Sequence, residues 1–96
     1  MISEEQNIVY IGNKPVTSYV LAVMTGLANS QGIVLKARGR AISTAVDVAE
    51  VTRRRFIKEL YVSKITIGTE EIQMEEGGKR AISTMEIVLS KLKAPT

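Results

Sequence analysis

The 96-residue sequence contains neither cysteine nor histidine. Because these residues supply the usual zinc ligands, the thiol nucleophile and the commonest general base, their absence excludes a disulfide framework, thiolate chemistry and histidine-based catalysis. The remaining serine, lysine and carboxylate side chains form no recognisable catalytic signature. The sequence therefore predicts a protein that is not an enzyme and that uses no metal and no cofactor.

Long apolar runs are also missing. No segment approaches the about 20 consecutive apolar residues of a membrane span, and residues 1–7 are polar and acidic rather than a signal sequence. We therefore expect a soluble, cytoplasmic protein with no membrane partner. The length fits one domain, residues 1–96, with loose ends at 1–6 and 94–96. Such a small domain has a thin core, and self-association is one way to bury more surface.

Positive charge is in modest excess, with 13 Lys and Arg against 10 Asp and Glu and a net charge of +3. This total is weak support for an anionic partner, so the distribution of charge has to decide. The octet Lys36–Ser43 joins an apolar run to an amphipathic one and holds three cations and a glycine. A junction of strand and helix suits phosphate contact. The alternative is an ordinary solvated turn.

The spacing of apolar residues predicts an α+β fold, a two-layer sandwich in the order β-α-β-α-β-β. Two helices are expected on one face of a four-stranded mixed sheet. Pro15 suits a first helical turn, Ser43 an N-cap, and the cations of residues 53–58 a helix C-terminal end. The expected strands span about 7–12, 33–35, 64–67 and 84–89, and the expected helices span 15–30 and 43–58.

Two apolar stripes and one apolar run mark the expected core. The run Ile8–Ile11 predicts a buried strand. The expected stripes are Val16, Tyr19, Val20, Val23, Met24 and Leu27 on the first helix, and Ile42, Ala45, Val46, Ala49, Phe56 and Ile57 on the second. Val48 and Val51 are expected beside the second stripe, where they suggest a subunit interface.

The dipeptide Gly77-Gly78 predicts a hairpin turn between the last two strands. The flanking segments 69–76 and 79–83 are too polar to be buried, so the hairpin should project from the body. Lys79 and Arg80 are candidates for phosphate contact near its tip. The arm also carries carboxylates that phosphates would repel, so the tip rather than the whole arm is expected to touch nucleic acid. These carboxylates belong to Glu70, Glu71, Glu75 and Glu76.

A second turn with a cation, Gly12–Pro15, follows the first expected strand. It has neither the P-loop pattern nor the dinucleotide glycine pattern, and an ordinary turn is the alternative. If the first two strands are parallel, both strand-to-helix turns open on one edge of the sheet. Lys14 would then lie beside the cations of the octet, with Gly39 allowing close backbone approach. Those cations are Lys36, Arg38 and Arg40.

Other roles for the arginines stay open. Arg38 and Arg40 would suit bidentate phosphate contacts, or they would form ion pairs with Glu50 or with the hairpin carboxylates. The run Arg53–Arg55 is most simply a solvated complement to a helix dipole.

Several motifs in this order resemble the Alba family of archaeal chromatin proteins. They are Ile11-Gly-Asn-Lys14-Pro15-Val16 with Tyr19-Val20, the octet Lys36–Ser43, Arg55-Phe56, and Ser83-Thr-Met-Glu-Ile87. The resemblance covers nearly the whole chain. It implies the fold predicted above and a homodimer that binds double-stranded DNA without sequence preference, and also RNA. Assembly of dimers on DNA is also implied, and pairing with a paralogue stays open.

The resemblance also implies roles for individual residues. The body would contact nucleic acid through Lys14, Lys36, Arg38, Gly39 and Arg40, and the arm through Lys79 and Arg80. Phe56 matches the phenylalanine that the family uses to pack dimer on dimer. Asn13 stands where many members have a second lysine, a proposed acetylation site, so Lys14 is the remaining candidate for that modification.

Three other functions stay open at this point. The first is an RNA-binding module in RNA processing or translation, although the aromatics form no RNA-recognition pattern; they are Tyr10, Tyr19, Tyr61 and Phe56. The second is an enzyme for a phosphorylated small molecule, which the missing catalytic residues disfavour. The third is a structural subunit that binds only together with another protein.

Overall fold

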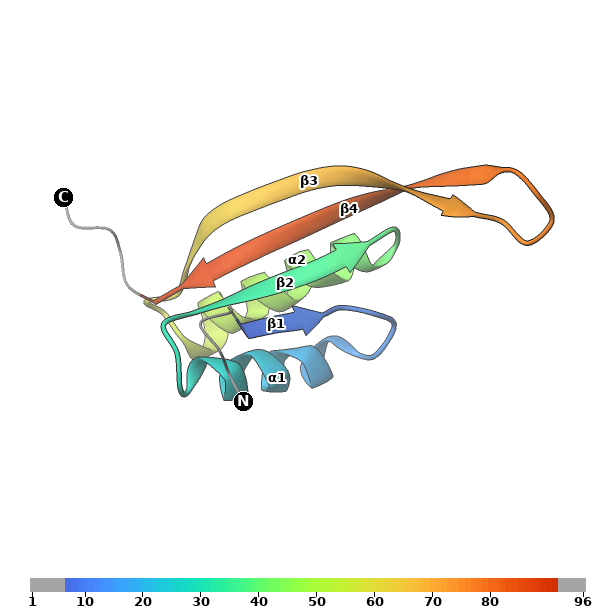
Figure 1. Cartoon of the computed structure of the whole chain (residues 1–96). Helices are drawn as coiled ribbons and strands as arrows, with labels where there is room; N and C mark the ends of the chain where they lie inside the picture. Colours follow the sequence, from blue (N-terminus) through green and yellow to red (C-terminus); the bar gives the residue numbers. More distant parts are fainter. Residues whose placement is uncertain (1–6, 92–96) are drawn as a thin grey trace.

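The computed structural model describes residues 7–91. Its order confirms the predicted β-α-β-α-β-β arrangement, with a short π-helical turn, η1, added after the second helix (Figure 1). The expected loose ends at 1–6 and 94–96 lie outside the described residues. The elements are β1 Asn7–Tyr10, α1 Val16–Leu27, β2 Gly32–Arg38, α2 Ala41–Val51, η1 Thr52–Phe56, β3 Tyr61–Gln73 and β4 Lys79–Ser90.

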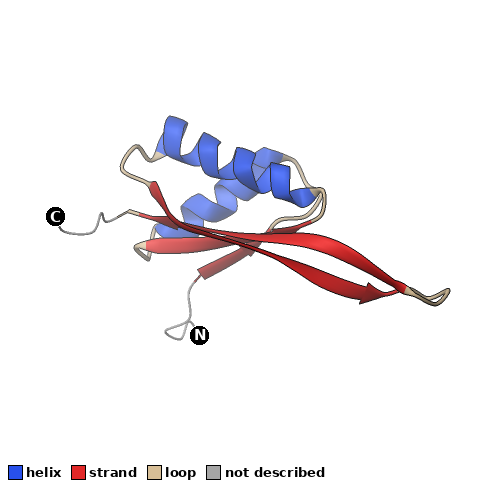
Figure 2. Ribbon diagram, turned by 90° about the horizontal axis from the view of Figure 1, so that it is seen from above, coloured by secondary structure: helices blue, strands red, loops and turns tan. Residues whose placement is uncertain are grey.

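The four strands form one mixed sheet in the order β1-β2-β4-β3. β1 runs parallel to β2, while β4 runs antiparallel to both of its neighbours. Both helices lie on one face of this sheet, and no helix of residues 7–91 covers the other face (Figure 2). Since β1 and β2 are parallel, their carboxyl ends and the turns that follow them share one edge of the sheet.

The helix boundaries differ from the predicted ones in ways that local contacts explain. α1 ends at Leu27, three residues early, and the Ser30 hydroxyl donates to the carbonyl of Gly26 at 3.0 Å. α2 begins at Ala41, after Arg40 as N-cap. The Ser43 hydroxyl donates backwards to the Arg40 carbonyl at 3.3 Å, so the prediction of Ser43 as N-cap is wrong. Ser43 lies inside the first turn, where its hydroxyl donates to a preceding carbonyl, whereas an N-cap hydroxyl would accept a free N–H of that turn.

The second helix does not end as a regular α-helix. The N–H of Ile57 donates to the carbonyl of Thr52 at 2.9 Å, which closes a wide π-helical turn over Thr52–Phe56. The run Arg53–Arg55 lies in this turn. Inside it, the buried Thr52 hydroxyl donates to the Val48 carbonyl at 2.8 Å, so the polar side chain is satisfied within the core.

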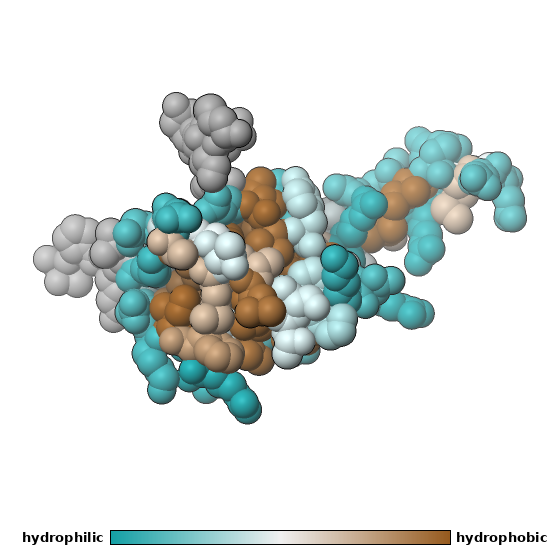
Figure 3. All heavy atoms as spheres, turned by 90° about the horizontal axis from the view of Figure 1, so that it is seen from below, coloured by the Kyte–Doolittle hydropathy of each residue, from teal (hydrophilic) through white to brown (hydrophobic). Residues whose placement is uncertain are grey.

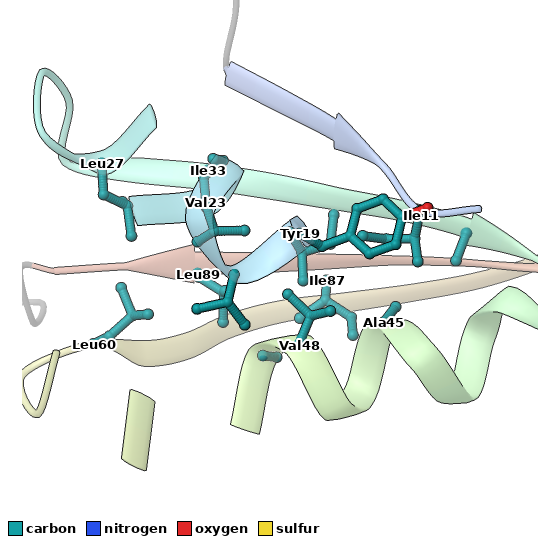
Figure 4. Packing of buried hydrophobic residues seen from close by; sticks show 14 residues of the cluster. Ile11, Tyr19, Val23, Leu27, Ile33, Ala45, Val48, Leu60, Ile87 and Leu89 are labelled. Carbon is teal, nitrogen blue, oxygen red and sulfur yellow. The ribbon is translucent and has the colours of Figure 1, made fainter. Parts of the chain in front are cut away.

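The core lies between the helices and the covered face of the sheet (Figure 4). On α2 it is formed by Ala45, Val48 and Ala49, and Thr52 at the start of η1 completes the i, i+3, i+4, i+7 spacing of one helical face. Val48 is 0% exposed at the centre of this stripe, so its expected place beside the stripe is wrong. Val46 is 42% exposed, so its expected core position is wrong as well.

The prediction of a fully buried first strand is also wrong. Val9 and Ile11 pack into the core, whereas Ile8 is 38% exposed and Tyr10 is 70% exposed. Alternate side chains of a strand point to opposite faces of the sheet, and the helices cover only one of them. Ile8 and Tyr10 therefore lie on the open face of the sheet.

The last two strands extend beyond the body as a two-stranded arm, as predicted (Figures 1 and 2). Their ladder continues to the pair Gln73 and Lys79, and Gly77 and Gly78 turn the chain with φ of 97° and 83°. Hydrophilic side chains cover most of the arm in Figure 3, with a few apolar ones between them. Within residues 7–91, no helix is long and apolar enough to cross a membrane.

Candidate nucleic-acid interface

The two strand-to-helix turns meet at the carboxyl ends of β1 and β2. The N–H of Ile11 donates to the carbonyl of Lys36 at 2.8 Å, which ties the end of β1 to β2 just before both turns begin. Beyond this bond, Lys14, Arg38 and Arg40 line one hollow of about 650 Å³. We call these three residues the basic edge. The expected meeting of Lys14 with cations of the octet is therefore found for both arginines.

The turn that carries Lys14 is shaped by a buried tyrosine. The Tyr19 hydroxyl accepts the backbone N–H of Gly12 at 2.8 Å and that of Lys14 at 3.0 Å. The Tyr19 side chain packs in the core, so the turn is fixed to the rest of the fold. Both amides are engaged by Tyr19, and Lys14 offers an anion its ammonium group rather than its N–H.

The turn that carries Arg40 needs a glycine. Gly39 has φ of +59°, which is a left-handed conformation that other residues adopt at a cost. Its N–H donates to the Ser83 carbonyl on β4 at 2.8 Å. Gly39 therefore holds Arg38 and Arg40 on either side of a turn that is bonded to the sheet, and its role is conformational.

Two of the predicted binding cations of the body are already paired with carboxylates. The Arg38 Nη1 atom lies 2.8 Å from Glu70 Oε1, and the Lys36 Nζ atom lies 3.5 Å from Glu86 Oε2. This confirms the alternative in which Arg38 binds a hairpin carboxylate. Lys36 lies away from the hollow, on the open face of the sheet. Among the described residues, no carboxylate forms an ion pair with Lys14 or Arg40, the remaining cations of the basic edge.

The predicted residues of the arm lie apart from the basic edge. Lys79 and Arg80 begin β4 next to the hairpin turn, and the Lys79 Nζ atom lies 3.6 Å from Glu71 Oε1. Both side chains are exposed. Lys79, one of the two predicted arm cations, thus has a carboxylate partner within the arm.

The arginines after α2 form a separate cluster. Glu50 accepts hydrogen bonds from Arg54 Nε at 2.7 Å and from Arg53 Nη1 at 3.0 Å. The hydrogen bond from Arg54, together with the weaker influence of Arg53, holds the pKa of Glu50 below its ordinary value. Glu50 therefore pairs within its own helix and not with Arg38 or Arg40. Phe56, at the end of η1, is 54% exposed, so a default core position for it is wrong.

The placement of Tyr10 was not predicted from the sequence. This ring lies on the open face beside Lys36, its partner in the β1–β2 register. Side chains in the run Ile8–Ile11 alternate between the two faces of the sheet, so when helices cover only one face, every second side chain is exposed. The continuous apolar character of the run concealed this alternation.

The chain is similar in sequence and in structure to known proteins. The family model described as Alba matches residues 7–69. The DNA/RNA-binding protein Alba of Methanocella arvoryzae is 46% identical over 93 residues, covering 96% of this chain and 97% of that protein. The protein of the same name from Methanococcus maripaludis is 51% identical over 87 residues, covering 88% and 98%. The solved structure of Alba from Thermoplasma volcanium superposes with a TM-score of 0.80 at 46% identity, covering 88% of this chain and 99% of that one.

Proposed function

Because this chain belongs to the Alba family, we propose that it binds double-stranded DNA, and also RNA, through the phosphate backbone and without sequence preference. The relatives named above are described as DNA/RNA-binding proteins. The function is a binding function, carried out in the cytoplasm on the chromosome, where the protein coats, compacts or bridges DNA.

One observation carries this proposal. Lys14, Arg38 and Arg40 line a single open hollow at the edge of the sheet, although Lys14 follows β1 and the two arginines lie at and just after the end of β2. Guanidinium groups donate two hydrogen bonds to a phosphate, and an ammonium group adds a compact charge. Contacts of this kind neutralise phosphates and position the protein without reading the bases.

The arm would contribute a second, weaker contact. Lys79 and Arg80 lie next to the hairpin turn, so they can reach a backbone that the basic edge already holds. The ion pair between Lys79 and Glu71 reduces the charge that the arm offers. The body therefore supplies most of the electrostatic attraction.

Apolar exposure supports a homodimer. Ile65 and Ile67 on β3 are 55% and 73% exposed. They point to the same face of the sheet as their register partners, the buried Ile87 and the partly buried Met85, which packs against the core. The helices pack against β1, β2 and β4, so the outer part of this face is left to a second copy of the chain. Phe56, also exposed, is available for contact between dimers on DNA.

The test is a salt titration of binding to two duplexes of unrelated sequence, followed by fluorescence anisotropy. For the wild type, log K should fall against log salt with a slope of about −0.9 for each phosphate contacted, and equally for both sequences. The double variant Lys14→Ala, Arg40→Ala should weaken both duplexes alike and flatten the slope by about one for each contact removed. Arg54→Ala removes one arginine that is paired with Glu50, and it is the control for the loss of a positive charge outside the basic edge.

Two results would contradict the proposal. Binding that does not depend on salt would show that phosphate neutralisation is not its basis. A loss confined to one of the two sequences would show that these side chains read bases.

An RNA-binding module is the second candidate, and the exposed ring of Tyr10 favours it. Aromatic rings on an open sheet are a common platform for unpaired bases. Competition between duplex DNA and structured RNA at equal salt separates the two functions, because only the second predicts a clear preference for RNA.

A further inference from the structure

The open face of the sheet carries a row of chemically different side chains beside the basic edge. Tyr10 on β1 is in register with Lys36 on β2, which is in register with Glu86 on β4. Neighbouring strands lie about 4.8 Å apart, so the row runs about 10 Å across the sheet. It offers an aromatic ring, a donor and an acceptor in that order.

Tyr10 has no structural task that explains its place. Its side chain is 70% exposed, and it is absent from the core cluster. Among the described residues, its hydroxyl takes part in no hydrogen bond. A large ring left in water on a sheet face is available for contact with another flat, apolar surface.

The ring borders a hollow of suitable size. Tyr10, Lys36, Arg38, Glu70 and Glu86 are among the residues that line a depression of about 500 Å³ on the open face. This volume lies in the range of about 300–1,000 Å³ that is typical of small-molecule sites. The depression can hold one nucleotide but is far too small for a duplex.

The depression adjoins the basic edge. Arg38 lines both this hollow and the one that holds Lys14 and Arg40. A strand whose phosphates lie at the basic edge therefore has a neighbouring nucleotide within reach of Tyr10. The two hollows thus border each other at Arg38, one at the edge of the sheet and the other on its open face.

The charges decide which part of a nucleotide belongs on this face. Lys36 pairs with Glu86, and Arg38 pairs with Glu70, so the cations of the depression are balanced by carboxylates. A phosphate would be repelled by those carboxylates, whereas a base is neutral and stacks on a ring. The backbone is thus directed to the basic edge and the base to the open face.

We infer that the open face is a second binding site, in which an unpaired base of a bound nucleic acid stacks on Tyr10. A duplex hides the faces of its bases inside the stack, so this site takes only nucleotides in loops, bulges or single strands. The inference rests on the proposed function, because the basic edge must hold the backbone. It adds a preference for nucleic acids that contain unpaired bases.

The test compares an RNA stem-loop that has an adenosine loop with a blunt duplex of the same stem, both measured by fluorescence anisotropy. Tyr10→Leu keeps an apolar side chain but removes the ring, and it should weaken stem-loop binding about tenfold. The dissociation constant of the blunt duplex should not change. Tyr10→Phe keeps the ring and should bind both RNAs as the wild type does. A 4-thiouridine placed in the loop should crosslink to the peptide that contains residue 10.

The result that overturns this site is an equal effect of Tyr10→Leu on both RNAs, or no effect on either. A loss in Tyr10→Phe as large as that in Tyr10→Leu would assign the contact to the hydroxyl and also overturn stacking. Thermal melting of each variant confirms that it folds, which is expected because Tyr10 is exposed. The double variant Lys14→Ala, Arg40→Ala should weaken the binding of both RNAs. Failure of the proposed function is recognised separately, because in that case the wild type would bind neither RNA.

Discussion

At the scale of single residues, one buried hydroxyl holds the turn that presents Lys14. Tyr19→Phe removes the acceptor of two backbone N–H groups, those of Gly12 and Lys14, and the turn has no replacement acceptor on the ring. We expect the free energy of unfolding to fall by about 1–3 kcal/mol, measured by urea denaturation. Tyr10→Phe, which removes an exposed hydroxyl, is the control and should leave this free energy nearly unchanged. Equal losses in the two variants would contradict the role given to Tyr19.

A second prediction at this scale concerns Glu70, which forms an ion pair with the guanidinium group of Arg38. Phosphate has to displace this carboxylate, so Glu70→Gln should strengthen duplex binding about threefold at low salt, since an exposed pair is worth up to about 1 kcal/mol. Stability should hardly change, because both side chains are more than half exposed, at 61% and 55%. Glu59→Gln alters the net charge equally without touching the basic edge. If Glu59→Gln strengthens binding as much, the effect belongs to net charge and not to Arg38.

The meeting of the interface cations at one edge of the sheet was predictable from the sequence, whereas their carboxylate partners were not. Charge clusters at the ends of apolar runs mark strand-to-helix turns, and this located Lys14, Arg38 and Arg40. The pair of Arg38 and Glu70 joins residues 32 positions apart and depends on the register of β3 against β4. No local sequence pattern encodes that register, so the sequence alone left Glu50 and the hairpin carboxylates as equal candidates for pairing with Arg38.

At the scale of elements, the joint between α2 and η1 should respond to acid. The hydrogen bond from Arg54, and then Arg53, keeps the pKa of Glu50 below its ordinary value of 4.5. A carboxylate with a lowered pKa in the folded state stabilises the fold fully above the unfolded pKa, and this contribution is lost as the pH falls through the folded pKa. The wild type should therefore exceed Glu50→Gln in unfolding free energy at pH 7 by up to about 1 kcal/mol, and the two should converge in acid.

The measurement is urea unfolding of both proteins at pH 7 and at several values below 4.5, the ordinary pKa of the group. Arg54→Ala removes the strongest of the interactions that lower this pKa, and it should reproduce most of the effect. A difference between wild type and Glu50→Gln that stays constant with pH would show that the carboxylate charge does not stabilise the joint.

Regular elements were easier to predict than their ends and faces. Helical spacing located α1 and the body of α2, and the glycine pair located the hairpin turn. The π-helical turn at Thr52–Phe56 was missed because the predicted stripe continued the helix from Ala49 to Phe56, across a polar run that carries no apolar spacing of its own. The open face of β1 was missed because a sequence of four apolar residues does not say that only one side of the strand is covered.

At the scale of the whole molecule, the parallel pair of β1 and β2 was the decisive prediction. It alone brought both strand-to-helix turns to one edge, and the register of the two strands confirms it. What remained hidden is the extent of helical cover. Two helices pack over β1, β2 and β4, and only the structure shows that the apolar side of β3 extends past them.

This uncovered side predicts the oligomeric state. The double variant Ile65→Asp, Ile67→Asp places charge on the apolar part of β3, so a dimer that buries these side chains should dissociate. Light scattering should give the mass of a dimer for the wild type and of a monomer for the variant. Thr66→Asp adds charge to the same strand on the opposite face, and it should remain dimeric.

A dimer also joins two basic edges, so the monomeric variant should show about half the wild-type slope of log K against log salt. A monomeric wild type, or a monomeric Thr66→Asp, would contradict this interface, because charge on the open face of β3 has no reason to break a contact made on the covered one.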